Sequence, residues 1–216
     1  MQGDDQGSRR QQLQAAFHKF NNLLVTIMGS ATLGKRETAA DSDAHRHLAN
    51  IEDASRQAAE LSQRMRDLIG LDDREEFEAL VPGAKAKPPA ESKDTVGAAV
   101  KDLVLVVDDD ATIRDLLVQM LEASGRRVMA AETGQEAIQA AQSHQSRLAA
   151  AIVDLTMPGM SGEQVFRELR NVLPDLRIIM MSGYDENASL AFLEGGTSEF
   201  LQKPFTLAEL REVLDA

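Results

Sequence analysis

The 216-residue sequence predicts two domains of different fold class: an all-α antiparallel helical hairpin, and an α/β domain built on a doubly wound, five-stranded parallel sheet. Two segments near the N-terminus repeat apolar residues at intervals of three and four, the spacing of packed helices. After residue 101, short apolar runs alternate with helical patterns five times, which is typical of a parallel sheet flanked by helices. An interval rich in Pro, Ala and Lys, typical of an extended linker, separates these two regions.

These patterns set the expected domain boundaries. We expect the chain to divide into a disordered N-terminus, a helical hairpin, a linker and an α/β domain, at residues 1–7, 8–72, 73–100 and 101–216. About 20 flexible residues within this linker have a root-mean-square span of roughly 25 Å, on a scale of about 5–6 Å times the square root of the residue number. The two domains should therefore be able to reach each other.

Composition excludes several classes of protein. No apolar run approaches the length of a membrane span, and the first ten residues lack the apolar core of a signal peptide. The chain has no cysteine, so it has no disulfide and no thiol chemistry. A net charge of −12 argues against a nucleic-acid face. We expect a soluble, cytoplasmic protein with neither a nucleic-acid nor a membrane partner.

The first predicted helix starts at a capping box formed by Ser8 and Gln11 and runs to about Gly34. Its apolar seam consists of six residues spaced by three or four positions, Leu13, Phe17, Phe20, Leu24, Ile27 and Ala31. His18 and Asn22 are four residues apart and lie off this seam, so we expect them to share an exposed face.

The second predicted helix follows a polar loop over residues 35–43. Its seam has the same spacing and comprises Ile51, Ala54, Ala58, Leu61, Met65 and Leu68. Two helices alone leave half of each seam in contact with water. Because pairing two hairpins into a four-helix bundle covers these seams, we expect a homodimer formed through the hairpin.

The α/β domain is predicted from five apolar runs that favour strands, at residues 103–107, 128–131, 149–153, 178–181 and 199–201. The intervening helices are expected at about 112–124, after capping boxes at Thr133 with Glu136 and Ser161 with Gln164, at about 186–194, and after the box at Thr206 with Glu209. The expected strand order is 2-1-3-4-5.

Polar residues stand at the ends of four of these five strands. They are Asp108 and Asp109, Asp154, Ser182 and Lys203. The carboxyl ends of parallel strands meet at one edge of the sheet, which is where ligands bind in open α/β folds. Crowded carboxylates repel one another, so the acidic cluster indicates a bound cation. The third acid of the first group, Asp110, is expected to cap the next helix.

This constellation resembles the receiver domain of response regulators, which has a flavodoxin-like fold. The resemblance covers about residues 101–216 and includes the segments Asp154-Leu-Thr-Met-Pro-Gly-Met-Ser-Gly162 and Lys203-Pro204-Phe205. It implies that Asp154 accepts a phosphoryl group, that Lys203 neutralises one phosphoryl oxygen, and that Ser182 donates to another. Inward movement of Ser182 would then free space for the aromatic switch residue, Phe200.

The same resemblance implies an Mg²⁺ site, because this ion prefers oxygen ligands in octahedral geometry. Asp109 and Asp154 would bind Mg²⁺ directly and Asp108 through water. The backbone carbonyl of Thr156 would be the further protein ligand. The resemblance also implies a cis peptide bond between Lys203 and Pro204.

The segment His18-Lys-Phe-Asn-Asn-Leu-Leu24, followed by Ile27-Met28-Gly29, resembles the dimerisation and histidine phosphotransfer domain of sensor histidine kinases. The resemblance covers roughly residues 8–72. It implies that His18 carries a phosphoryl group on an imidazole nitrogen, and that Asn22 positions a water for dephosphorylation. Lys19 departs from the family, which usually has an acid at this position to accept a hydrogen bond from the imidazole.

We therefore interpret the chain as a two-component phosphorelay protein, in which Asp154 accepts a phosphoryl group and His18 exchanges it with an aspartate. Residues 73–100 are too few for an ATP-binding domain, so autophosphorylation from ATP is not expected. Expected partners are a cognate histidine kinase, another response regulator or a phosphotransfer protein. The alternatives are a phosphatase or phosphate sink, a non-enzymatic dimeric regulator that uses the hairpin for docking, and a fragment of a longer hybrid kinase.

Overall fold

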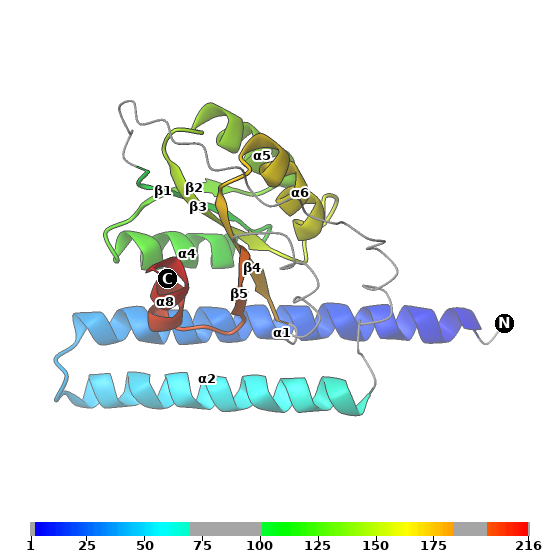
Figure 1. Ribbon diagram of the computed structural model, residues 1–216. Helices are drawn as coiled ribbons and strands as arrows, with labels where there is room; N and C mark the ends of the chain where they lie inside the picture. Colours follow the sequence, from blue (N-terminus) through cyan, green and yellow to red (C-terminus); the bar gives the residue numbers. More distant parts are fainter. Residues whose placement is uncertain (1–2, 70–100, 184–197, 216) are drawn as a thin grey trace.

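The computed structural model describes residues 3–69, 101–183 and 198–215 (Figure 1). Helices α1 (Gly3–Glu37) and α2 (Asp43–Leu68) form an antiparallel hairpin that lies along one side of an α/β unit. The predicted linker, and the helix predicted at residues 186–194, fall outside the described residues. No helix within the described segments has both the length and the apolar character needed to cross a bilayer.

Helix α1 extends beyond both of its predicted ends. It begins at Gly3 rather than at Ser8, because adding residues to an existing helix costs far less than nucleating one. It also continues past Gly34 to Glu37. A Cβ atom at Gly34 would lie 3.2 Å from Leu48 Cδ1, so this glycine allows α2 to approach closely and does not end α1.

Polar contacts join the two helices near the loop. Glu52 accepts a hydrogen bond from Thr32 Oγ1 at 2.5 Å and pairs with Lys35 Nζ at 2.7 Å. The apolar seam is largely uncovered in the single chain, where Leu13, Phe20, Ile27, Ile51, Leu61, Met65 and Leu68 are exposed. Both helices of the hairpin therefore carry apolar side chains that are exposed in the single chain.

The α/β unit has the predicted topology, a parallel five-stranded sheet in the order β2-β1-β3-β4-β5. Its strands are β1 (Leu103–Val107), β2 (Arg127–Ala131), β3 (Leu148–Asp154), β4 (Arg177–Ser182) and β5 (Ser198–Gln202). Its described helices are α4 (Ala111–Glu122), α5 (Gly134–Ser143), α6 (Gly162–Val172) and α8 (Leu207–Asp215). Every predicted strand is present, with ends that differ from the prediction by at most one residue.

The predicted caps account for the helix starts in this unit. Asp110 accepts a hydrogen bond from the Thr112 backbone N–H at 2.9 Å and begins α4. Ser161 and Gln164 form a reciprocal capping box at the start of α6. Such side chains satisfy backbone donors that the first turn of a helix leaves unpaired.

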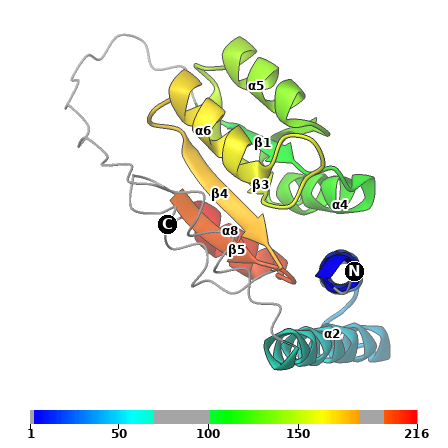
Figure 2. The same cartoon turned by 90° about the vertical axis from the view of Figure 1, so that its right-hand side faces the viewer.

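Helices cover both faces of the sheet, with α4 and α8 on one face and α5 and α6 on the other (Figure 2). Strand β1 is buried along its whole length, as expected for an uninterrupted apolar run in a parallel sheet. Each face has its own apolar cluster, and the cluster beneath α4 and α8 includes Val25 from α1. The hairpin therefore contributes directly to the core of the α/β unit.

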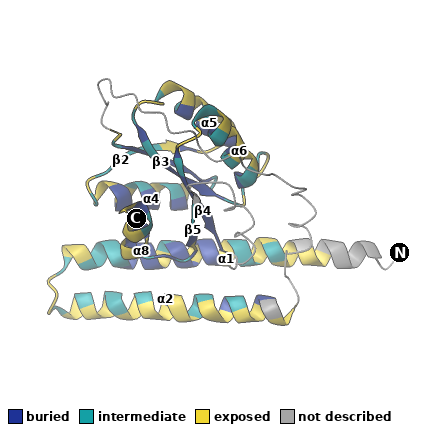
Figure 3. Cartoon of the chain, viewed as in Figure 1, coloured by how far each residue is buried: buried dark blue, intermediate teal, exposed yellow. Residues whose placement is uncertain are grey.

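Helix α1 is buried on the face that contacts the α/β unit (Figures 2 and 3). Val25 and Met28 are fully buried there, and a Cβ atom at Gly29 would meet Leu116 of α4 at 2.5 Å. Asn22 is only 6% exposed, and His18 is half-buried. The prediction that His18 and Asn22 share an exposed face is therefore wrong, because the α/β unit covers that face.

The first residue of α6 generates a test of the fold. A Cβ atom at Gly162 would lie 2.2 Å from the Asp154 backbone oxygen, so Gly162→Ala should destabilise the protein by about 3 kcal/mol. Gly125→Ala is the control: nothing lies within 4 Å of its Cβ position, and its φ of 81° makes the expected loss about 1 kcal/mol. Urea unfolding followed by circular dichroism measures both, and equal losses would contradict the predicted clash.

Candidate functional site: an acidic pocket at the sheet edge

The acidic pocket forms where β1, β3, β4 and β5 end. Asp108 and Asp109 follow β1, Asp154 ends β3, Ser182 ends β4, and Lys203 follows β5. These strands are neighbours in the sheet, so their polar ends meet at one edge. The structure thus brings together side chains that are up to 95 positions apart in the sequence.

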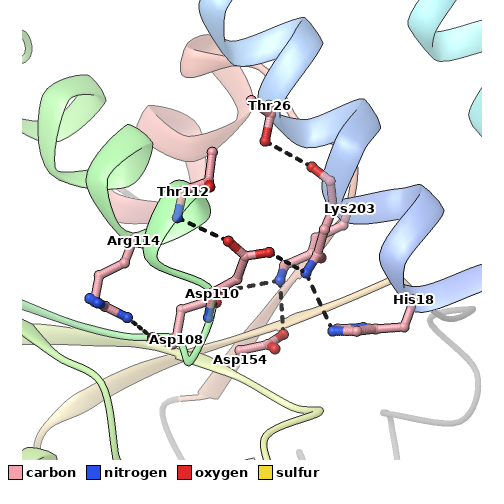
Figure 4. Close-up of polar contacts among 9 residues, drawn as sticks. His18, Thr26, Asp108, Asp110, Thr112, Arg114, Asp154 and Lys203 are labelled. Carbon is pink, nitrogen blue, oxygen red and sulfur yellow. Dashed lines mark hydrogen bonds and ion pairs between the residues drawn. The ribbon is translucent and has the colours of Figure 1, made fainter. Parts of the chain in front are cut away.

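Lys203 is the central cation of this pocket. Its Nζ donates to Asp154 Oδ1 at 3.0 Å and to Asp108 Oδ2 at 3.2 Å, and all three side chains are essentially inaccessible to water (Figure 4). The second Asp108 oxygen accepts the backbone N–H of Asp110 at 2.9 Å. Both carboxylate oxygens of Asp108 are therefore already paired.

Unlike the oxygens of Asp108, two other carboxylate oxygens in the pocket have no hydrogen-bond donor. Asp109 Oδ1 and Asp154 Oδ2 are buried without a hydrogen-bond partner. Asp108, Asp109 and Asp154 each offer a ligand oxygen, and these atoms lie within 4.8 Å of one another. Buried anionic oxygens without donors are costly unless a cation compensates them. This donor set of hard oxygens fits Mg²⁺.

The electrostatics of the pocket reflect crowding and burial. Burial raises the pKa of Asp154 to about 7; the Lys203 ammonium opposes this shift, and the Asp108 carboxylate adds to it. Burial, followed by the Asp108 charge, also raises the pKa of Asp109. The pKa of Lys203 is raised, because Asp154 and Asp108 together outweigh its desolvation.

His18 reaches this pocket from α1 (Figure 4). Asn22 Nδ2 lies 3.4 Å from both His18 Nε2 and Asp110 Oδ2, so the asparagine bridges the imidazole and the acidic loop. Burial and then the nearby Lys203 charge lower the pKa of His18, and Asp108 and Asp110 oppose that shift. An amide nitrogen only donates, so this contact fits an imidazole with the lone pair on Nε2.

The other predicted site residues have less direct contacts with the pocket. Phe200 is half-buried and packs against the cluster beneath α5 and α6. Thr156 is exposed, and its assignment as a carbonyl ligand stays a prediction. Ser182 is buried, and its backbone oxygen accepts the Lys203 N–H at 2.6 Å. The Lys203-Pro204 peptide bond is cis, as the resemblance implied.

Sequence reasoning missed three residues around the pocket. Arg114 Nη1 donates to the Asp108 backbone oxygen at 2.8 Å. Asn21 and Arg66, one from each hairpin helix, both donate to the backbone oxygen of Gly183. Asn21 directly precedes Asn22 in the segment that resembles histidine kinases, which is a weak sequence signal for a functional residue. The sequence around Arg66 carries no such signal.

Comparison with known families identifies the α/β unit. The sequence model described as Response regulator receiver domain matches residues 104–215, just over half of the chain. The chain belongs to the response regulator receiver family. The hairpin lies outside this match.

Two relatives and one solved structure illustrate the similarity. The response regulator MprA of Mycolicibacterium vanbaalenii is 37% identical over 108 residues, which cover 50% of this chain and 46% of that protein. The sensor kinase CckA of Brucella abortus is 34% identical over 128 residues, covering 59% of this chain and 13% of the kinase. The chain thus spans less than half the length of either relative.

The solved structure is that of the response regulator TrrA from Thermotoga maritima in complex with Mg²⁺ and BeF. It has 33% sequence identity and a TM-score of 0.46, and the similarity covers 53% of this chain and 96% of that one.

The raised pKa of Asp154 predicts the pH dependence of stability without metal. Between the unfolded value of 3.8 and about 7, the folded receiver binds more protons than the unfolded chain, so stability falls as pH rises across this window. In the presence of a chelator, the unfolding free energy of the parent should fall as pH rises through this window. The fall should exceed that of Asp154→Asn by on the order of 2 kcal/mol. Urea titrations followed by circular dichroism measure the difference.

The exposed residue Asp115 of α4 provides the control, and Asp115→Asn should keep the pH dependence of the parent. A parent and an Asp154→Asn variant with the same pH slope would contradict the prediction.

Proposed function

We propose that this chain is a phosphorelay protein in which Asp154 accepts a phosphoryl group from a partner and exchanges it with His18 of the same chain. The observation that carries the proposal is the placement of His18, which α1 brings to the pocket that contains Asp154 (Figure 4). His18 is half-buried, and the charges of Lys203 and Asp108 both act on its imidazole.

The chemistry of the first step follows from the pocket. An Asp154 carboxylate oxygen attacks the phosphorus of a phosphohistidine on a partner kinase or phosphotransfer protein. The new O–P bond forms as the N–P bond breaks, and the departing imidazole keeps the electron pair of the broken bond. Lys203 already donates to Asp154, so its ammonium is positioned to neutralise a phosphoryl oxygen. The Ser182 hydroxyl is proposed to donate to another.

The exchange step uses His18. Its Nε2 lone pair attacks the phosphorus of the acyl phosphate, an N–P bond forms, and the P–O bond to Asp154 breaks to regenerate the carboxylate. The lowered pKa of His18 favours the neutral imidazole, which is the nucleophilic form. The reverse reaction returns the phosphoryl group to Asp154.

Asp109 and Asp154 are proposed as the direct Mg²⁺ ligands, because each has a buried oxygen without a hydrogen-bond partner and both belong to the cluster of ligand oxygens that lie within 4.8 Å of one another. Asp108 fits a role through water, since its oxygens already accept hydrogen bonds from Lys203 and Asp110. Thr156 is proposed to add its backbone carbonyl. Bound Mg²⁺ supplies charge neutralisation between the carboxylates and the phosphoryl oxygens.

Labelling with a radioactive small phosphodonor and Mg²⁺ tests the proposal. Acyl phosphates are lost in base, whereas phosphohistidine survives, so base treatment separates the two products. The parent should carry both labels, His18→Ala only the base-labile label, and Asp154→Ala neither. Chelation of Mg²⁺ should reduce labelling of every protein by at least about 100-fold, because removing such a charge from phosphoryl transfer costs several kcal/mol.

His47 of α2 is exposed and provides a matched control, so His47→Ala should behave like the parent. Base-stable label that persists in His18→Ala, or its absence from the parent, would refute exchange with His18.

A specific observation favours a second function, dephosphorylation of the receiver. Asn22 Oδ1 is buried without a partner beside the pocket, and a carbonyl oxygen there can accept a hydrogen bond from a water that attacks the acyl phosphate. In that case Asn22→Ala would lengthen the lifetime of the Asp154 phosphoryl group. The parent would form no base-stable label, so His18→Ala would label like the parent. If neither variant changes labelling, the hairpin serves only as a docking element.

We also propose that the hairpin pairs with a second copy of the chain. Its exposed seam lines an apolar groove between α1 and α2, formed by residues that include Leu13, Phe20, Leu61 and Met65. The residues that line this groove all belong to α1 and α2, so pairing there leaves the contact between α1 and α4 intact. A four-helix bundle would remove these side chains from water.

Sedimentation of the full chain tests this pairing. The parent should sediment as a dimer, with twice the mass of the 23.5 kDa chain. Leu61→Glu should weaken the dimer by at least about 10-fold, because burying a leucine contributes about 1.5–3 kcal/mol and a carboxylate cannot replace it. Gln57→Glu, at an exposed polar position of α2, is the control. A parent that stays monomeric would refute the pairing.

A further inference from the structure

We infer that Asn21 and Arg66 are positioning residues that set the register of the hairpin on the receiver by binding one backbone oxygen, that of Gly183. This inference rests on the proposed exchange between Asp154 and His18, because register decides where the imidazole lies relative to the acceptor. We call the three residues the Gly183 clamp.

The clamp joins both hairpin helices to the end of one strand. Asn21 Nδ2 of α1 donates to Gly183 O at 3.0 Å, and Arg66 Nη2 of α2 donates to the same oxygen at 2.5 Å. Asn21 is 3% exposed and Arg66 is 5% exposed. The Arg66 guanidinium also lies 5.9 Å from the centre of the Phe17 ring. Two buried polar side chains thus converge on a single acceptor.

The backbone at Gly183 leaves no space for a side chain. A Cβ atom there would lie 2.4 Å from Asn21 Nδ2 and 3.3 Å from Asn21 Cβ. Only glycine lets α1 come close enough for the hydrogen bond. The clamp therefore depends on glycine at position 183 of the receiver as well as on Asn21 and Arg66 of the hairpin.

The remaining contacts between the hairpin and the receiver define register less closely. One is the long hydrogen bond from Asn22 to Asp110, at 3.4 Å, and the others are apolar. Val25 and Met28 are buried against the receiver, and Gly29 meets Leu116. Apolar attraction is non-directional, and a shift by one residue moves a helix by only about 1.5 Å along its axis. Hydrogen bonds depend on distance and angle, so the clamp resists a shift that the apolar contacts tolerate.

Register matters because His18 lies one helical turn from Asn21. Reacting atoms need to approach to about 3–3.5 Å, and a misplacement of about 1 Å can reduce a rate by about 100-fold. Gly183 also directly follows Ser182, whose backbone oxygen accepts the Lys203 N–H. The clamp therefore fixes His18 against the end of β4, which carries Ser182 and lies beside Lys203.

Two measurements on the full chain test the clamp. The sequence has no cysteine, so Asp53→Cys and Gln139→Cys, at exposed positions of α2 and α5, place two unique spin labels. Pulsed electron paramagnetic resonance should give a narrow distance distribution in the parent. It should broaden in Asn21→Ala, in Arg66→Ala and in Gly183→Ala. Asn50→Ala and Arg64→Ala, at exposed positions of α2, are the matched controls.

The second measurement is phosphoryl transfer. Asn21→Ala and Arg66→Ala should lower the rate of exchange between Asp154 and His18 by about 100-fold, and leave labelling of Asp154 by a small phosphodonor unchanged. Arg66→Lys, which keeps one cationic donor, should restore part of the rate. A purely structural role would reduce both rates together.

The outcomes separate the two proposals. Unchanged distance distributions in the alanine variants would overturn the clamp, whatever the fate of the phosphoryl group. If the parent forms no phosphohistidine, the proposed exchange fails, and the distance distributions alone decide whether the clamp positions the hairpin. Gly183→Ala alters the receiver side only, so it tests the clamp independently if a hairpin variant fails to fold.

Discussion

The pocket depends on one electrostatic constraint: several carboxylates share a dry strand edge with a single lysine. Lys203 pairs with Asp108 and Asp154 but leaves one oxygen of Asp154 and one of Asp109 unpaired. Burial magnifies the repulsion among these charges, as the raised pKa values of Asp154 and Asp109 indicate. This excess of negative charge makes the strand edge suited to bind Mg²⁺, and a bound Mg²⁺ would also offset the charge of incoming phosphoryl oxygens.

The sequence predicted the α/β unit well because its signals are local. Strand β1 is an uninterrupted apolar run that ends in carboxylates, and Asp110 and Ser161 mark the helix starts that follow β1 and β3. Parallel topology then brings the strand ends to one edge. Neither step needs information about the hairpin, so the positions of Asp108, Asp154 and Lys203 followed from the sequence alone.

The docking of the hairpin was not predictable in the same way. Periodicity separated the seam from His18 and Asn22 correctly, but a polar residue off the seam has the same local pattern whether water or another domain covers it. Helix α1 has a buried face that is separate from the largely exposed seam and contains Val25 and Met28 beside Asn21 and Asn22. The receiver surface is what buries this face. The close contact between Gly34 of α1 and Leu48 of α2 was not predictable for the same reason, because Leu48 lies 14 residues further along the chain.

A relay of the proposed kind imposes a further requirement, because His18 and an external donor must reach Asp154 from the same edge of the sheet. Docking of the hairpin therefore has to be reversible. A flexible tether with the length of the predicted linker would give an effective concentration in the millimolar range, which would allow such reversible docking. An interface whose intrinsic dissociation constant lies below this concentration stays docked most of the time and still opens transiently. A few buried side chains and one clamped carbonyl suffice for such an interface, whereas a much larger apolar contact would close Asp154 to any partner.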